Sequence, residues 1–452
     1  MRTRKESTRR EFLRVSSRTA LALGTVGALE RFGRFNAFAQ EAGDYRALVC
    51  VFLFGGNDSN NLVVPLDATR YDLYRRARGI LALPSTGVLP FGTSTAGEFG
   101  LHPSLAALRT LYIERRLAVV ANIGNLVRPT TRTEYRAGGT PLPEQLFSHE
   151  DQIAQMQAGI PADASTGWGG RTVDQLQDLN GTLGFPPSLS MSGAALFCVG
   201  ERVGSAGLGT GSLELLALNL STEQDRVARA QSHQEILQMD SGMRLIQKSN
   251  EVRVKAAELD DMLRNTDPPV ELQTQFPDTG LGQQLKEVTR FIQLREVYGL
   301  RRQVFFCATG GFDTHSDQLP SQAGLLAGVS EAMAAFYRAT EELGVANSVT
   351  AFTESDFSRT LNPSGNGTDH AWGGHHLVLG GAVAGGEMYG TFPSLALGGP
   401  DDTGSRGVFI PTTALSQYGA TLARWFGVAE ESLPAVFPQL VNFADRDVGF
   451  MG

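Results

Sequence analysis

The sequence contains little cysteine and no apolar run long enough to cross a membrane. Its 452 residues include three cysteines, Cys50, Cys198 and Cys307, and an odd number leaves at least one thiol unpaired. Cys50 and Cys307 lie within apolar, strand-like runs, which indicates buried free thiols. Because a membrane-spanning helix needs about 20 apolar residues, we expect no membrane span in the mature protein.

The sequence also lacks an excess of positive charge. Lys and Arg number 39 against 47 Asp and Glu, which gives a formal net charge of −8. A general nucleic-acid-binding protein would show a basic footprint, so we expect no nucleic-acid partner. The hydrophobic fraction of 42% is ordinary for a soluble globular protein.

Histidine is scarce, at seven residues, and the residue pairs that bind copper in copper proteins are absent. The chain has neither the His-x-His nor the Cys-His pairs of copper centres, which argues against a copper oxidase. Two of the histidines, His102 and His233, stand apart from other chemically informative residues. The other five lie in short polar segments, most of which also carry aspartate.

The N-terminal segment carries the three ordered features of an export signal. An arginine pair, Arg9-Arg10, precedes a weakly apolar stretch at 19–29, and Ala37-Phe38-Ala39 is the small-x-small pattern that signal peptidase recognises. We therefore predict that residues 1–39 are a twin-arginine signal peptide. The expected consequences are the twin-arginine translocase as a partner during export, and a periplasmic or secreted protein that is exported folded.

Apolar runs alternate with helical patterns along the rest of the chain. Strands buried on both faces are predicted at 48–54, 117–123, 304–308 and 349–353. Helices are predicted at 101–116, 322–343 and 412–426. This alternation predicts an α/β fold, with a mostly parallel sheet sandwiched by helices, in a single domain over 40–452. The charged segment at about 221–294 predicts a helical insertion that packs on the sheet or caps the site.

Polar segments follow three of the predicted strands, and a fourth lies further along the chain. The aspartates and histidines that they carry are Asp58, Asp313, His315, Asp356, Asp369 and His370. Ligands of a parallel α/β sheet bind outside the carboxyl ends of its strands, so we expect these side chains to converge. Mixed carboxylate and imidazole ligands predict a divalent metal, with Zn or Mn favoured over Ca or Mg.

Several of these residues also fit an ordinary structural role. Asp58 and Asp356 are suitable as helix caps or turn residues. His375 and His376 are compatible with the start of a strand, with one ring buried and the other exposed. The joint placement of the polar segments at strand ends favours the metal site.

Ser148 is the predicted nucleophile. The segment 147–156 predicts a helix that starts near Ser148, and a helix N-terminus favours an anion such as phosphate. A neighbouring metal would be needed to activate the hydroxyl. Serine followed by acidic residues is also typical of a capped helix without any catalytic role. Arg359 is either a clamp for an anionic substrate or a surface residue.

Together these segments resemble the domain-of-unknown-function 1501 family, bacterial proteins with twin-arginine signals that look like remote members of the alkaline phosphatase and sulfatase superfamily. The matching stretches are 54–58, 148–149, 311–315, 354–360, 367–370, 379–381, 385–386 and 389–390. The resemblance implies an alkaline phosphatase-like fold and a metal-dependent hydrolase of phosphate or sulfate esters, acting on a small or polymeric anionic substrate. It places the nucleophile at Ser148 and the metal ligands at Asp58, Asp313, His315, Asp356 and His370.

The sequence departs from the superfamily pattern at Phe357. An Asp-His pair is common there, whereas Asp356 is followed by phenylalanine. Either one metal binds, or Asp369 or His375 replaces the missing imidazole. The segment 198–202 lacks the proline of the Cys-x-Pro-x-Arg motif from which sulfatases form formylglycine. The alternative function is an exported, metal-containing binding or assembly protein without turnover.

Overall fold

The computed structural model describes residues 44–94, 97–159, 164–181, 185–208 and 266–452, together with Ser232, Glu235, Gln247 and Met262. The described residues from Arg46 onward belong to one compact unit. The signal peptide expected at 1–39 lies outside the described residues, as does most of the helical insertion expected at 221–294. Both therefore stay predictions.

A nine-stranded, mostly parallel sheet forms the centre of this unit, in the order β11-β5-β10-β9-β1-β8-β6-β7 with β12 beside β5. Strand β1 (Arg46–Leu53) pairs in parallel with β8 (Arg302–Thr309) and with β9 (Val349–Ser355). Strand β10 (Gly374–Gly380) is antiparallel to both β9 and β5 (Leu117–Gly124). The short strands, which all pair in parallel, are β6 (Ser188–Ser190), β7 (Ser205–Gly207), β11 (Met388–Tyr389) and β12 (Thr413–Ala414).

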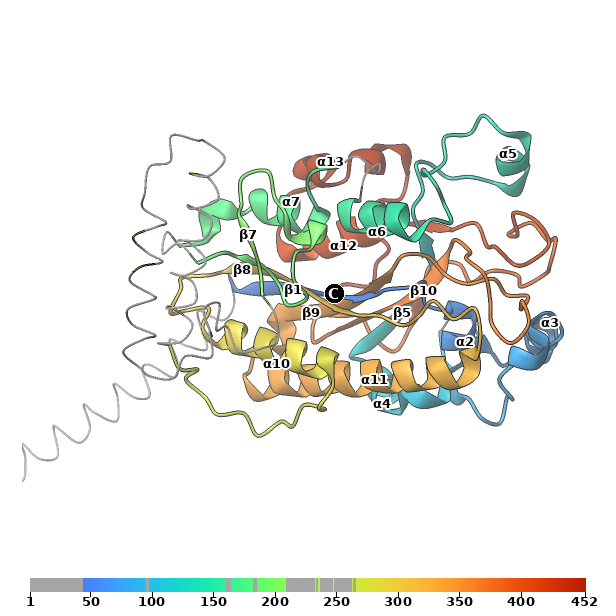
Figure 1. The fold of residues 1–452 in the computed structure, drawn as a ribbon, viewed down its shortest axis with the longest axis horizontal. Coiled ribbons are helices and arrows are strands. Elements are labelled where there is room, and N and C mark those ends of the chain that lie inside the picture. The colour runs from blue at the N-terminus through green and yellow to red at the C-terminus, as the bar shows by residue number, and fades with distance from the viewer. Residues whose placement is uncertain are drawn as a thin grey trace, which may run out of the picture. The chain divides into compact units, whose positions relative to one another are not determined.

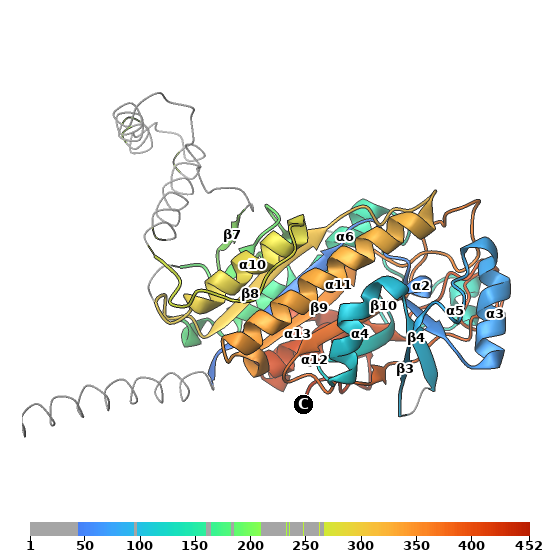
Figure 2. The same cartoon turned by 90° about the horizontal axis from the view of Figure 1, so that it is seen from below.

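Helices cover both faces of the sheet, as Figures 1 and 2 show. One face carries α4 (Ala106–Ile113), α10 (Gly280–Gln293) and α11 (Gln318–Glu342). The other carries α6 (His149–Ala158), α7 (Trp168–Asp174), α12 (Leu415–Phe426) and α13 (Leu433–Val436). Because both faces are covered, the central strands consist of nearly unbroken apolar residues. The predicted α/β sandwich is confirmed.

The predicted helix at 101–116 has different bounds in the structure. Leu101 ends β4 (Glu98–Leu101), which pairs with β2 (Val63–Pro65) and β3 (Leu89–Gly92) in a second sheet. Proline then starts the 3-10 turn η3 (Pro103–Leu105), and α4 follows it. The apolar residues of such short strands alternate too few times for a period of two to be recognised.

The remaining elements are short and lie mainly in connections. The helices are α2 (Ser59–Leu62), α3 (Ala68–Arg78) and α5 (Arg132–Ala137). The 3-10 turns are η2 (Gly79–Leu81), η4 (Gln177–Leu179), η5 (Leu196–Cys198), η6 (Ala346–Ser348), η7 (Glu430–Ser432) and η8 (Pro438–Asn442).

All three cysteines are buried and unpaired, which confirms the prediction made for Cys50 and Cys307. Burial raises the pKa of the Cys198 thiol to about 12, so this thiol stays protonated at neutral pH. In the part of the chain that the structure describes, we find no helix with the length and apolar character of a membrane span.

Candidate metal centre

The backbone brings five polar segments to one edge of the sheet. Leu53 of β1 lies in register with Thr309 of β8 and Ser355 of β9, so the loops after these strands begin side by side. Strand β10 runs in the opposite direction, so the segment before it, 367–373, reaches the same edge. The start of α6 also lies there, since His149 contacts Asp356 directly after β9.

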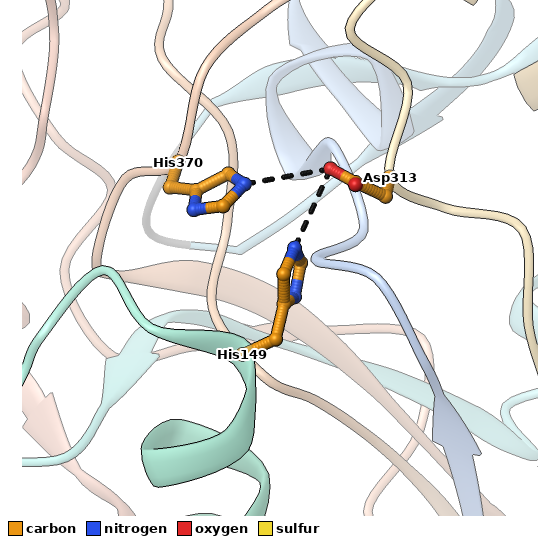
Figure 3. A group of neighbouring side chains, drawn as sticks. All are labelled: His149, Asp313 and His370. Carbon is orange, nitrogen blue, oxygen red and sulfur yellow. Dashed lines mark ion pairs between the residues drawn. The ribbon is translucent and has the colours of Figure 1, made fainter.

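His149, Asp313 and His370 form the core of the cluster at this edge (Figure 3). Oδ1 of Asp313 lies 3.5 Å from Nε2 of His149 and 3.4 Å from Nε2 of His370. Ligand atoms of a tetrahedral zinc ion, each about 2.0–2.1 Å from the metal, lie about 3.4 Å apart. The two distances to Asp313 therefore suit a divalent cation, and all three ligand atoms lie within 4.8 Å of one another. We call these three residues the metal centre.

Both imidazoles of the metal centre are oriented through their second ring nitrogen. Nδ1 of His149 lies 2.7 Å from Oδ2 of the buried Asp356, and Nδ1 of His370 lies 2.7 Å from the carbonyl oxygen of Phe147. The carbonyl can only accept a hydrogen bond, and the carboxylate accepts one as well, so each Nδ1 carries the proton. In the neutral form of either ring, Nε2 is then left with its lone pair, which is how metal-binding histidines are held.

Electrostatics inside the metal centre favour a bound cation. Nε2 of His149 is buried and makes no hydrogen bond to any described residue, while it faces a carboxylate oxygen of Asp313. Burial lowers the pKa of His370, so its ring is neutral at pH 7 and its Nε2 faces the same oxygen unprotonated. The guanidinium of Arg359, 2.6 Å from the same oxygen, offsets part of this negative charge, and a divalent ion would offset the repulsion that remains between the oxygen and the lone pairs. The donor set therefore fits a metal.

His315 and Asp369 lie on the solvent side of the metal centre. Nε2 of His315 is 3.0 Å from Oδ1 of Asp313 and 3.1 Å from Nε2 of His370. Its Nδ1 is 3.4 Å from Oδ1 of Asp369, and the other oxygen of Asp369 pairs with Arg406. The side chain of His315 is 48% exposed, so this ring can act as a further ligand or transfer protons with solvent.

Arg359 is buried beneath the metal centre and holds Asp313. Its Nη1 lies 2.6 Å from Oδ1 of Asp313 and 3.2 Å from the carbonyl oxygen of Gly55. Its Nε and Nη2 donate to the hydroxyl and carbonyl of Thr368. Burial opposes ionisation of Asp313, but the hydrogen bond and charge of Arg359 outweigh it and lower the pKa of Asp313. Arg359 is therefore neither a surface residue nor a side chain that is free to bind an anionic substrate, which were the two roles expected from the sequence.

Two of the predicted ligands, Asp58 and His375, are not brought to the metal centre. Asp58 is buried, caps α2 and forms an ion pair with Arg78. His375 is buried in β10, where its Nδ1 accepts a hydrogen bond from the backbone N–H of Asn122 at 3.0 Å. Burial lowers the pKa of His375 to about 3, so this ring is neutral. The two side chains take the alternative roles of helix cap and buried strand residue.

Ser148 adjoins His149, but its hydroxyl is bonded to its own helix. Oγ lies 2.5 Å from Oδ2 of Asp151 and accepts a hydrogen bond from the backbone N–H of Asp151 at 3.4 Å. Ser148 is therefore the N-cap of α6. The same geometry directs the hydroxyl proton at a carboxylate, as in a base-activated nucleophile.

Phe357 packs against both imidazoles of the metal centre. Its ring centroid lies 4.8 Å from that of His149 and 4.6 Å from that of His370. The loop after β1 passes so close to this layer that a Cβ on Gly56 would come within 2.5 Å of the Phe357 ring. A Cβ on Gly55 would lie 2.4 Å from the backbone nitrogen of Asp313. Glycine is required at both positions for the loop to approach.

No role was predicted for His149 or Arg406, although both lie at this site. His149 belongs to the matched pair Ser148-His149 at the start of a predicted helix, but no sequence pattern placed that helix near the strand ends. Arg406 lies in an irregular loop with no strand before it, so the sequence offered no signal for it. Its ion pair with Asp369 becomes visible only in the folded chain.

Comparisons with known proteins identify a family. The model of a family described as "Protein of unknown function (DUF1501)" matches residues 45–406. No curated protein matches the chain. A sulfatase from Pseudoalteromonas sp. is 10% identical, with a TM-score of 0.35, over 88% of this chain and 71% of that one. The phosphonate monoester hydrolase of Silicibacter pomeroyi is 9% identical, with a TM-score of 0.38, over 85% and 74%. That of Agrobacterium radiobacter is 8% identical, with a TM-score of 0.33, over 84% and 74%.

Proposed function

The chain belongs to the DUF1501 family of proteins of unknown function, and from the geometry of its metal centre we propose that it is a metal-dependent hydrolase of phosphate or sulfate esters. The observation that carries the proposal is the convergence of two Nε2 atoms and one carboxylate oxygen from His149, His370 and Asp313. The mixed nitrogen and oxygen donors suit Zn or Mn. The centre opens to solvent on the side of His315, where an ester can approach.

The residues around the centre have separate roles in this proposal. When bound, the divalent cation supplies the Lewis-acid charge that binds an ester oxygen and offsets negative charge developing in the transition state. Arg359 keeps Asp313 ionised and in place. Asp356 holds the ring of His149, and Phe357 excludes water from the inner side of both imidazoles.

Ser148 is the proposed nucleophile, with Asp151 as its base. Oγ attacks the phosphorus or sulfur atom while its proton passes to the Asp151 carboxylate, which lies 2.5 Å away. The bond from that atom to the ester oxygen breaks, and the departing alcohol takes a proton from solvent. Water then hydrolyses the ester formed on Ser148, which restores the serine and releases phosphate or sulfate.

Metal analysis combined with an ester panel tests the proposal. The mature protein should contain about one equivalent of Zn or Mn and hydrolyse members of a panel of aryl phosphates and aryl sulfates. His149→Ala should lose both metal and activity, whereas Glu150→Ala, at the exposed neighbouring position, should keep both. A protein that stays metal-free after reconstitution with Zn and Mn contradicts the metal centre. A Ser148→Ala variant that retains activity contradicts the assignment of the nucleophile.

A second candidate function is a metal-containing binding or assembly protein without turnover. The observation that favours it is the ion pair of Asp58 with Arg78, which removes one of the ligands implied by the superfamily resemblance. Phe357 also stands where a further imidazole was expected. A metal-loaded protein that is inert on the whole ester panel, yet binds a surface glycan or a partner protein, would favour this function.

Export through the twin-arginine pathway is part of the same proposal. The supporting feature is the sequence of residues 1–39, in which Arg9-Arg10 precedes the apolar stretch and Ala37-Phe38-Ala39 follows it. Folding before export would enclose the correct metal in the cytoplasm, away from competing ions. Replacement of both arginines by lysine should retain the full-length precursor in the cytoplasm, as measured by fractionation and immunoblotting. Unchanged export of that variant would contradict the pathway.

A further inference from the structure

The side chain expected to clamp the anionic group of the substrate, Arg359, is not free to do so. Its side chain is fully buried, and its hydrogen bonds go to Asp313, Gly55 and Thr368. A guanidinium group recognises an anion through N–H donors that reach solvent. Another cation at the solvent side of the metal centre is therefore needed if this site binds an anionic ester.

We propose that Arg406 is the residue that recognises the negative charge of the substrate at this site. Its Nη1 lies 2.5 Å from Oδ2 of Asp369, whose Oδ1 lies 3.4 Å from His315. His315 in turn contacts Asp313 in the metal centre at 3.0 Å. The guanidinium of Arg406 is thus linked to the metal centre through two side chains on the solvent side. This inference rests on the proposed function, because it takes the substrate to be a phosphate or sulfate ester.

Arg406 retains donors for a ligand. Its side chain is 45% exposed, and among the residues that the structure describes only Asp369 bonds to its guanidinium. The remaining N–H groups bond to no described residue, so they can donate to the oxygens of a phosphate or sulfate group. An arginine held by one carboxylate and open on its other edge is suited to bidentate recognition of such a group.

The loop that carries Arg406 is held firmly in place. The buried carboxylate of Asp402 accepts hydrogen bonds from the backbone N–H groups of Gly404 and Gly407, each at 3.0 Å, on either side of Arg406. The carbonyl oxygen of Arg406 accepts a further bond from the backbone of Asn362 at 3.0 Å. A positioned backbone reduces the entropy that a binding side chain loses when it meets its ligand.

The charges at the site explain why Arg406 is needed. In their ordinary ionised states the carboxylates of Asp151, Asp313, Asp356 and Asp369 outnumber the guanidinium groups of Arg359 and Arg406 by two. A divalent cation makes the site neutral. Without Arg406 the loaded site would carry one net negative charge, which repels a phosphate or sulfate group.

Binding of inorganic phosphate and sulfate to the metal-loaded protein, measured by isothermal titration calorimetry, tests the proposal. Arg406→Gln should weaken phosphate binding by roughly ten- to hundredfold, the loss of a charged hydrogen bond, with an unchanged metal content. Arg406→Lys should be intermediate, because lysine keeps the charge without the fork. The matched control is Arg338→Gln near the far end of α11, since that arginine is also ion-paired and 42% exposed. The control should bind phosphate like the wild type.

The outcomes separate this inference from the proposed function. If no ester is hydrolysed but Arg406→Gln still loses phosphate, Arg406 stands as an anion-binding residue and the hydrolase proposal fails. If esters are hydrolysed, Arg406→Gln should raise KM by more than it lowers kcat. Wild-type phosphate affinity in a folded, metal-loaded Arg406→Gln variant overturns the inference. Failure of the loaded wild-type protein to bind phosphate or sulfate overturns it as well.

Discussion

Replacing Asp356 with asparagine should weaken metal binding without removing a metal ligand. The buried carboxylate accepts a hydrogen bond from Nδ1 of His149 at 2.7 Å and bonds from the backbone N–H of Gly55 at 3.1 and 3.2 Å. The side chain of asparagine has almost the same shape but only one acceptor oxygen. In Asp356→Asn the single oxygen can accept from Nδ1 of His149 only in the place of Oδ2, where the bond is no longer charged, and the NH₂ group then faces the N–H of Gly55.

The magnitude of this effect follows from the bond that is lost. A hydrogen bond to a charged group contributes about 1.5–3 kcal/mol, and partners that orient metal-binding histidines change metal affinity by roughly 10–100-fold. Burial raises the pKa of Asp356, so the wild-type carboxylate is costly to ionise, and its loss is partly offset. We therefore expect the lower end of this range, a loss of about tenfold.

A chelator competition assay with Zn and thermal unfolding with and without metal both report this change. At a fixed excess of metal, a tenfold weaker Kd removes about 1.4 kcal/mol of the metal-dependent increase in unfolding free energy. Asp174→Asn is the control, since this buried carboxylate also accepts backbone N–H groups but contacts the loop at 201–203. It should lower stability equally with and without metal.

Two results would refute the reasoning about Asp356. Wild-type affinity for Zn in the Asp356→Asn variant would show that the carboxylate does not orient His149. A loss far beyond hundredfold, with a changed number of bound metal ions, would show that Asp356 is itself a ligand, as the superfamily resemblance implies.

Three further predictions follow from the same structure. Gly55 has a φ of +112, and a Cβ there would clash with the backbone at 312–313, so Gly55→Ala should unfold at a markedly lower temperature and lose metal. The control is Gly344→Ala, because Gly344 has a φ of +69 but open space around it. In denaturant titrations this control should lower the unfolding free energy by only about 1 kcal/mol. Burial lowers the pKa of His102 to about 4, below its unfolded value, so its neutral form contributes stability that is present above about pH 6.5 and lost as the pH falls toward 4. A pH series of unfolding free energies should therefore be flatter by up to about 3 kcal/mol for His102→Asn, and an unchanged slope would contradict this. Phe357→His should still bind one metal by elemental analysis, because Asp58 remains paired with Arg78; a second equivalent would contradict that reading.

Four strands of the central sheet, β1, β5, β8 and β9, were predictable from sequence to within a few residues, whereas β10 was not predicted. Helices cover both faces of the sheet, so runs such as 48–54 and 349–353 need apolar side chains on both sides of the strand. Such runs can be recognised in the sequence. The small sheet of β2, β3 and β4 was not predictable, since its strands are only three or four residues long. Strands of that length are defined by their partners and not by their own pattern.

The convergence of Asp313 and Asp356 followed from sequence alone, because each lies just after a parallel strand of the sheet. His370 was expected at the same edge, but its position before the antiparallel strand β10 is seen only in the structure. Knowing the edge, however, does not reveal which side chains face one another. Whether a carboxylate binds metal or satisfies a buried cation depends on partners that are remote in sequence.

The sequence by itself determined four strands of the sheet, the polar segments that follow three of them, and the residue types suited to a divalent metal. Only the tertiary structure determined which side chains form the metal centre. In the folded chain Asp58 forms an ion pair with Arg78, and the buried Arg359 forms one with Asp313. The start of α6 places His149 beside Asp356. The physical reason is that a charge removed from water must find a partner within hydrogen-bonding distance, and the folded backbone determines which partner that is.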